Sequence, residues 1–277
     1  MPKIPAPPLP KGLQPKPKKP GESNGQVQAH PQPLEAGVSV VGWLDERMSM
    51  SGGLRWLMWR KVPRGINWAY TLGSATLFAF LNQAVTGVFL AMYYRPDVSG
   101  GAYESVRNIN DNVFLGQLVR GMHKWGASVM IILIFLHMGR VFFYGAYKYP
   151  RELTWVIGVV LLILTLAMGF TGYLLPFDQR SYWATVVGVN INAGGPFLGP
   201  FLSDFLLGGA DFGATTLSRF YAIHMLLIPG AMAALIGAHL YLVTKLGISA
   251  PPSRKLDRNG PMNGPPALIL IATIVAQ

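Results

Sequence analysis

Four stretches of this chain are apolar over more residues than a helix needs to cross a membrane. They cover about residues 68–94, 118–144, 153–175 and 218–246. The hydrocarbon core of a bilayer is about 30 Å thick and is crossed by roughly 20 apolar helical residues. Only 13% of the residues are charged, against about 25% in ordinary globular chains. We therefore predict an all-α membrane protein with a bundle of four transmembrane helices.

The segments outside these stretches differ from them in composition. Residues 1–37 are rich in proline and contain five lysines, which indicates a disordered basic tail. Residues 38–62 mix tryptophan and aliphatic side chains with charged ones, as is typical of an amphipathic helix at a membrane surface. We expect the four-helix domain to occupy residues 63–250, followed by a C-terminal tail over residues 251–277.

The basic residues indicate how the chain is oriented. The N-terminal flank, the loop Lys148–Arg151 and the tail from Lys245 onward hold 16 of the 23 lysine and arginine residues. Loops rich in lysine and arginine stay on the cytoplasmic side, so both termini and this loop are expected there. Because the charges cluster at the ends of spans and not on one folded face, they argue against nucleic-acid binding.

Four of the five histidines lie in two pairs inside the second and fourth apolar stretches. His123 and His137 are 14 residues apart, and His224 and His239 are 15 residues apart. Each pair extends roughly 21–22 Å along one broad helix face, close to the two edges of the hydrocarbon core. Both spans run in the same direction, so His123 and His224 (the outer pair) share one level. His137 and His239 (the inner pair) share the other.

Two imidazoles at each of two levels can bind two b-type haems, one above the other. Histidines inside a bilayer are costly and usually functional, although they can also hydrogen-bond across helix interfaces. The match in height between two helices favours haem. Zinc usually takes four ligands, whereas each level offers two histidines. With both axial positions of an iron filled by histidine, no site for oxygen remains, and the expected chemistry is electron transfer.

Glycines in the other two spans repeat the spacing of the first histidine pair. Gly73 and Gly87 are 14 residues apart, as are Gly158 and Gly172. A macrocycle that lies against a helix needs a position without a side chain, which glycine provides. Glycine is also common where membrane helices pack closely. The repeated interval favours haem contact at all four positions.

Cationic side chains flank the histidines. Arg120 and Arg140 are expected to pair with haem propionates at the two membrane faces. Arg219 suits either this role or that of an anchor for the end of the fourth span. The chain contains no cysteine, which excludes disulfides, thiolate zinc sites, iron–sulfur ligation and thioether-linked haem.

Seven motifs resemble the cytochrome b of quinol–cytochrome c reductases, in particular the shorter cytochrome b6 type. They are YYRP (Tyr93–Pro96), RGMHKW (Arg120–Trp125), LHMGR (Leu136–Arg140), PRELTWVIG (Pro150–Gly158), GYLLPFDQ (Gly172–Gln179), LSRFYAIH (Leu217–His224) and KLGIS (Lys245–Ser249). The resemblance runs from about Trp43 to Pro251. The 15-residue interval of the second histidine pair is the spacing of the b6 type.

The resemblance implies a subunit that passes electrons across the membrane in a quinol:cytochrome c (or plastocyanin) reductase. The outer pair would hold a low-potential haem and the inner pair a high-potential haem. Electrons would pass from a quinol oxidation site to a quinone reduction site. Pro176, Phe177 and Asp178, which begin the long loop between the last two spans, would contribute to the oxidation site. The complex would be a homodimer in a bacterial cytoplasmic membrane or a thylakoid.

The chain departs from the b6 pattern at three positions. Thr71 stands where b6 proteins carry the cysteine that binds a third haem, so a thioether-linked haem is not expected. Thr244 replaces an arginine near the inner quinone site. Phe177 replaces the tryptophan of the family's LPW sequence.

The resemblance also implies partners. The chain contains no PEWY-like sequence, and in b6-type systems this motif of the quinol oxidation site lies on a separate subunit. A PEWY-bearing subunit, a Rieske iron–sulfur protein and a c-type cytochrome or plastocyanin are therefore expected.

Two alternative functions remain open at this stage. One is the di-haem membrane anchor of a dehydrogenase or hydrogenase, and the other is a haem-free assembly scaffold.

Overall fold

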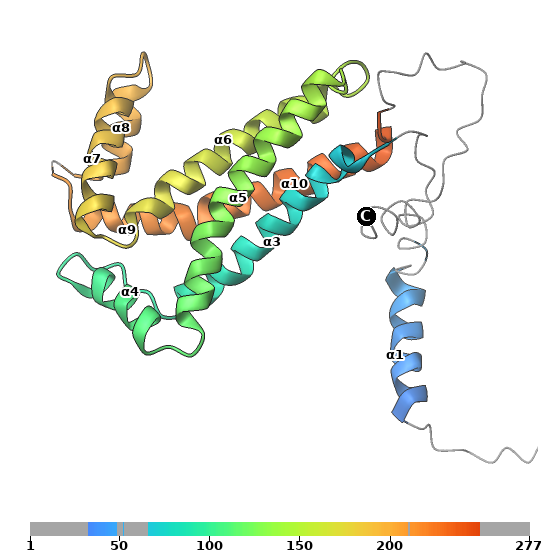
Figure 1. The fold of residues 1–277 in the computed structure, drawn as a ribbon, viewed down its shortest axis with the longest axis horizontal. Helices are drawn as coiled ribbons and strands as arrows, with labels where there is room; N and C mark the ends of the chain where they lie inside the picture. The colour runs from blue at the N-terminus through green and yellow to red at the C-terminus, as the bar shows by residue number, and fades with distance from the viewer. Residues whose placement is uncertain (1–32, 49–51, 53–65, 210, 250–277) are drawn as a thin grey trace, which may run out of the picture. The chain divides into compact units, whose positions relative to one another are not determined.

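A computed structural model describes residues 33–48, 52, 66–209 and 211–249, and the regular elements in these residues are all helices (Figure 1). The chain divides after Trp56 into two parts, and each is described by itself. In the first part, α1 covers Pro33–Met48, so this helix begins within the segment expected to be a tail. The rest of the expected surface helix, apart from residue 52, lies outside the described residues.

The second part contains the four expected spans. The first consists of the 3₁₀ turn η1 (Trp68–Thr71) and α3 (Leu72–Ala91), the second of α5 (Gly116–Phe143), the third of α6 (Glu152–Leu174), and the fourth of α9 (Ala214–Ala222), the π turn η2 (Ile223–Leu227) and α10 (Ile228–Leu246). All four are long and apolar enough to cross a membrane. The prediction of an all-α membrane protein with four spans is confirmed.

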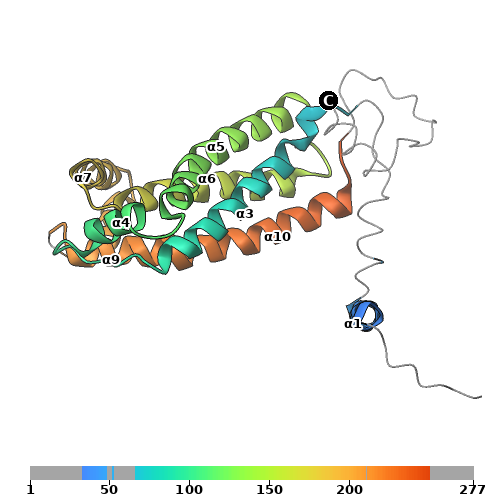
Figure 2. The same ribbon diagram turned by 60° about the horizontal axis from the view of Figure 1, so that its bottom comes forward.

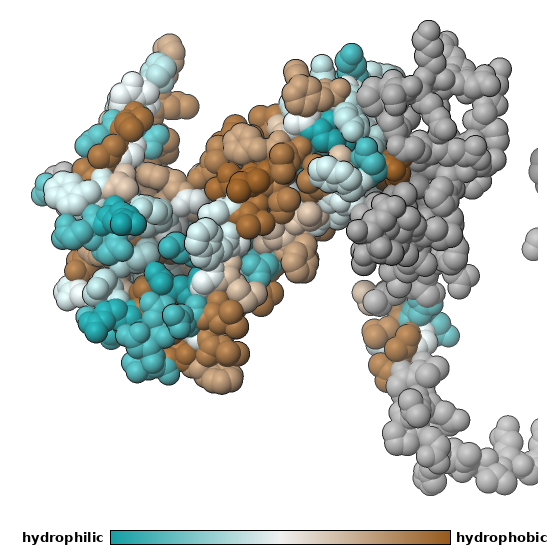
Figure 3. Space-filling model, viewed as in Figure 1, coloured by the Kyte–Doolittle hydropathy of each residue, from teal (hydrophilic) through white to brown (hydrophobic). Residues whose placement is uncertain are grey.

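The spans pack in pairs around an apolar middle layer. Helix α3 lies along α5, and α6 lies along α10 (Figures 1 and 2). The buried residues of this layer are Ala79, Met130, Ile134, Ile228 and Met232. Large apolar side chains also cover the outside of the bundle, where Figure 3 shows brown over the middle of the spans. An apolar exterior of this kind is suited to contact with lipid tails.

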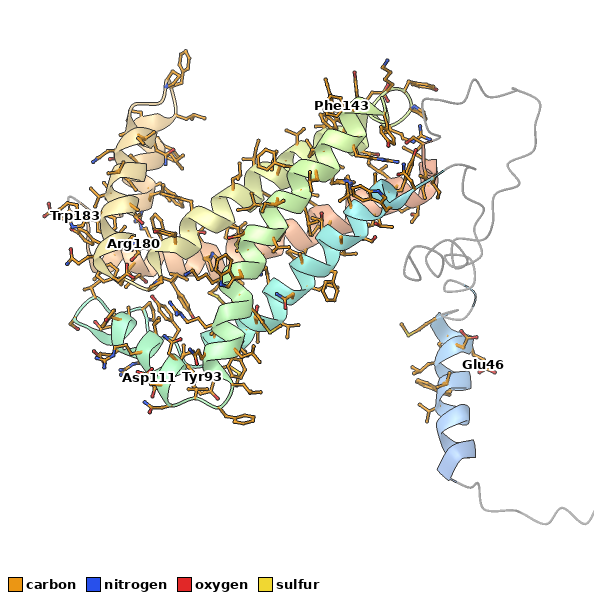
Figure 4. The ribbon with its side chains drawn as sticks, in the orientation of Figure 1. Glu46, Tyr93, Asp111, Phe143, Arg180 and Trp183 are labelled. Atoms are coloured by element: carbon orange, nitrogen blue, oxygen red, sulfur yellow. The ribbon has the colours of Figure 1, made fainter. Side chains whose placement is uncertain are left out.

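Shorter helices collect at one end of the bundle. Helix α4 (Gly101–Asp111) connects the first two spans, and α7 (Gln179–Ala193) with α8 (Gly199–Leu207) forms a hairpin between the last two. In Figure 4, Asp111 and Trp183 mark this end, and Phe143 marks the opposite end. The long loop is thus a folded hairpin, which packs on α6 and α9. We call this end, where the spans of the outer histidine pair begin, the outer end.

Three hydrogen bonds between elements hold the ends of the spans. At the outer end, the Tyr94 hydroxyl donates to the Leu175 carbonyl at 2.6 Å. At the inner end, the Arg151 guanidinium donates to the carbonyls of Gly247 (3.2 Å) and Leu246 (3.5 Å). Arg151 therefore supplies donors to carbonyls that the end of α10 leaves without helical partners.

Candidate haem sites

Each glycine of the outer level lies directly against one histidine. A Cβ atom added to Gly87 would lie 3.2 Å from Cε1 of His123. A Cβ atom on Gly172 would lie only 2.5 Å from Cε1 of His224. The rings of His123 and His224 lie close together across the bundle in an edge arrangement, with centroids 6.4 Å apart and planes inclined at 75°. The outer histidines thus meet at one level, as the spacing predicts.

The inner level repeats the arrangement. A Cβ atom on Gly73 would lie 3.1 Å from Cε1 of His137. A Cβ atom on Gly158 would lie 3.6 Å from Cε1 of His239 and 3.9 Å from the sulfur of Met138, the neighbour of His137. All four glycine–histidine pairs join helices that are distant in sequence. The apolar middle layer separates the two levels, since its residues lie between the paired positions on each span.

The residues at both levels fit a haem better than zinc. At three of the four glycines, a side chain would approach an imidazole more closely than ordinary van der Waals contact allows. A flat macrocycle held by imidazole requires such side-chain-free helix surface beside its ligand. Within the described residues, no group of three or more histidine, cysteine or acidic side chains could hold a metal ion. The imidazoles therefore come as pairs, which suits axial ligation of haem iron.

A π turn explains the longer interval of the second histidine pair. His224 lies in η2 (Ile223–Leu227), where the N–H of Ile228 bonds to the carbonyl of Ile223. A π turn contains one more residue than an α turn. The π turn takes up one residue of the 15-residue interval from His224 to His239. The remaining 14 steps turn the helix to about 40° short of whole turns, as in the interval from His123 to His137. Both histidine pairs therefore point along comparable faces, although their sequence intervals differ.

Two threonines at the outer level were not identified from the sequence. The Thr86 hydroxyl lies 2.9 Å from Nδ1 of His123, and the Thr171 hydroxyl lies 3.2 Å from Nδ1 of His224. Each threonine immediately precedes a glycine that faces the same histidine. The sequence signal was the Thr-Gly dipeptide, which occurs once in the first span and once in the third, at the outer level of each.

The two arginines flanking the histidines differ in their surroundings. The guanidinium of Arg140 lies 3.6 Å from the ring centroid of Tyr70, and its Nε and Nη2 atoms are buried. Among the described residues Arg140 forms no ion pair, so its charge is available to an anionic group. Arg120 donates to the side chain of Asn110 at 3.4 Å and lies at the outer end.

Arg219 serves as an anchor between elements. Its guanidinium donates to the Phe205 carbonyl near the end of α8, and it lies over the Phe205 ring at 5.7 Å. Of the two roles the sequence leaves open, the described contacts match that of a structural anchor.

The expected quinol loop forms a tight turn at the outer end. Phe177, next to Pro176, has a left-handed φ of 49°, and its N–H donates to the Leu174 carbonyl at 2.8 Å. Asp178 caps α7, because its carboxylate accepts from the N–H of Ser181 at 2.8 Å. The three loop residues therefore shape the entry into the α7–α8 hairpin.

The fold and the paired imidazoles are typical of transmembrane cytochromes, a class of protein that carries haem between helices. Residues 57–247 match the family described as Cytochrome b/b6/petB. The chain is 43% identical over 220 residues to the menaquinol:cytochrome c reductase cytochrome b subunit of Bacillus subtilis (strain 168), covering 76% of this chain and 98% of that protein. It is 43% identical over 213 residues to cytochrome b6 of Heliobacterium modesticaldum, covering 76% of this chain and 100% of that protein.

A solved structure agrees with these relatives. A chain of a hyperthermophilic respiratory Complex III matches with a TM-score of 0.75 and 31% identity, over 85% of this chain and 64% of that one. This chain therefore belongs to the cytochrome b/b6 family, as its motifs predict. It is an integral membrane protein of a family whose prosthetic group is haem b.

Proposed function

We propose that the chain is the electron-carrying cytochrome b subunit of a quinol:cytochrome c (or plastocyanin) reductase. The observation that carries this proposal is that four glycines on two spans each face one histidine on the other two spans, at two levels. The family membership and the cytochrome b relatives support the same function.

In this proposal each level binds one haem b between two imidazoles. The outer pair, His123 and His224, holds the low-potential haem, and the inner pair, His137 and His239, holds the high-potential haem. When bound, the haems provide one-electron carriers across the membrane. The four glycines leave room for the macrocycles, and Arg120 and Arg140 bind propionates at the outer and inner ends. Because the chain has no cysteine, neither haem is linked by a thioether.

Quinol oxidation takes place at the outer end in this proposal. Pro176, Phe177 and Asp178 form one wall of the site, and a PEWY-bearing subunit supplies the remaining part. A quinol that loses two electrons and two protons there sends one electron to a Rieske protein and the other inward to a quinone. The Rieske protein passes its electron to a c-type cytochrome or plastocyanin. The complex is a homodimer in a bacterial cytoplasmic membrane or a thylakoid, with both termini of this chain on the cytoplasmic side.

A redox difference spectrum of the purified complex tests the proposal. We expect two b-type haems per chain, and His123→Leu should remove the outer haem while the inner one is retained. His137→Leu is the matched variant and should remove the inner haem. Co-purification of a PEWY-bearing subunit and a Rieske protein would distinguish a reductase from a dehydrogenase anchor. Absence of b-type absorption from the complex would refute electron transfer by this chain.

A further inference from the structure

The outer histidines have side-chain hydrogen-bond partners that the inner histidines lack. Nδ1 of His123 meets the Thr86 hydroxyl, and Nδ1 of His224 meets the Thr171 hydroxyl. Within the described part of the chain, no hydrogen bond joins an inner histidine to a side chain, and the partner of the buried His239 ring is the backbone of Thr154. The two levels therefore differ in the groups that surround their imidazoles, although their glycines are equivalent.

The hydrogen bonds of the threonine hydroxyls assign the proton on each outer imidazole. The Thr86 hydroxyl donates its one hydrogen to the Asn82 carbonyl at 2.6 Å. The Thr171 hydroxyl donates in the same way to the Ala167 carbonyl at 2.9 Å. Each hydroxyl oxygen is then left to accept from an Nδ1–H group. Both outer histidines are thus held as the tautomer whose Nε2 lone pair is free to bind a metal.

A ligand histidine that donates its second N–H to an acceptor is both oriented and made more basic. A more basic ligand favours the ferric over the ferrous state and lowers the reduction potential. Among the described residues, no side chain accepts a hydrogen bond from an inner histidine, so this lowering of the potential by a side-chain acceptor is absent there. Each Thr-Gly dipeptide therefore combines two functions, since the glycine clears space beside an imidazole and the threonine fixes that imidazole.

We propose that Thr86 and Thr171 are positioning residues for the outer haem, which hold its two ligands and keep its potential below that of the inner haem. This inference rests on the proposed bis-histidine binding. It assigns part of the potential difference that moves electrons inward to two hydroxyl groups on the spans that carry no histidine ligand.

The test is a redox titration of the complete membrane complex carrying Thr86→Val, which removes the hydroxyl and keeps the shape of the side chain. We expect the midpoint potential of the outer haem to rise and that of the inner haem to remain unchanged. Thr86→Ser should restore the wild-type value. Thr171→Val should raise the same potential. In both variants the histidine keeps a backbone partner, which is Met168 at 3.0 Å for His224 and Gln83 for His123.

Two other threonines serve as matched controls. Thr76 in the first span and Thr165 in the third also donate to the carbonyl four residues earlier, each at 2.8 Å. Neither of these two hydrogen bonds involves a histidine. Thr76→Val and Thr165→Val should leave both potentials unchanged. An unchanged or lowered outer potential in Thr86→Val, or an equal rise in Thr76→Val, would overturn the inference. Absence of two haems from the wild-type complex would instead overturn the proposed function.

Discussion

At the scale of single residues, each imidazole has free space beside it because the residue that faces it is glycine, which has no Cβ atom. The four glycine–histidine approaches are not equally close, since the added Cβ would lie 2.5 Å from a ring atom at Gly172 and 3.6 Å at Gly158. Side chains in a packed interior cannot absorb an overlap of that size without leaving their rotamers or moving the backbone. Gly172 should therefore be the least tolerant of substitution among the four glycines.

Gly172→Ala should displace the ring of His224 and reduce the occupancy of the outer haem, with overpacking that costs about 1–3 kcal/mol. The measurement is haem content by difference spectroscopy, together with the thermal unfolding of the complex. Gly237→Ala is the matched control, because a Cβ there meets nothing within 4 Å, and it should keep both haems. Full outer-haem content at wild-type stability in Gly172→Ala would contradict this account of the glycine.

The positions of the glycines and histidines could be predicted from the sequence, because helical periodicity converts a 14-residue interval directly into height and direction. The threonines could not. Any threonine in a membrane helix can bond to its own helix, as Thr76 does. Which of them also meets a histidine depends on how the helices pack, and periodicity within one span does not contain that information.

At the scale of elements, short helices at the outer end are fixed to the spans by specific polar contacts. The α7–α8 hairpin is joined to the fourth span through Arg219, whose guanidinium binds the Phe205 carbonyl. Carbonyls at the end of a helix lack intrahelical donors and carry partial negative charge, so a cation is a favourable partner there. The hairpin that forms the expected quinol loop thus depends on a residue five positions before His224.

Arg219→Gln should loosen this anchor by about 1 kcal/mol, the scale of one hydrogen bond, without changing haem content. Hydrogen–deuterium exchange should become faster over α8 and remain unchanged over α3. Arg180→Gln, on the exposed surface of α7, is the control and should leave exchange as in the wild type. If Arg219 instead bound a propionate, the outer potential would shift and exchange over α8 would stay the same.

The elements themselves were only partly accessible from the sequence. Long apolar spans are predictable because length and composition define them. The π turn at His224 was not, since an interval of 15 residues does not reveal where the extra residue is accommodated. The α7–α8 hairpin mixes polar and apolar residues without a strong period, and its helices are held by tertiary contacts with α6 and α9.

At the scale of the whole molecule, the two ends of the bundle carry different elements. The helices α4, α7 and α8 lie at one end, and Phe143 and the basic loop Lys148–Arg151 that follows it lie at the other (Figure 4). The positive-inside rule assigns the basic end to the cytoplasm. In the proposed orientation, the outer histidine pair and the expected quinol loop face the opposite side, where partners that accept electrons from quinol would have to dock.

Single cysteines can test this orientation, because the wild-type chain contains none and gives no background labelling. Tyr149 lies in the basic loop and is 86% exposed, and Asp111 is exposed at the other end. A maleimide that cannot cross membranes should label Asp111→Cys in intact spheroplasts. Tyr149→Cys should react only after the membrane is opened. Its labelling in opened membranes is the control that this cysteine can react with the maleimide. The reverse pattern would invert the assignment of both haem levels. Labelling of both cysteines in sealed cells would contradict the single crossing by α5 that separates the two positions.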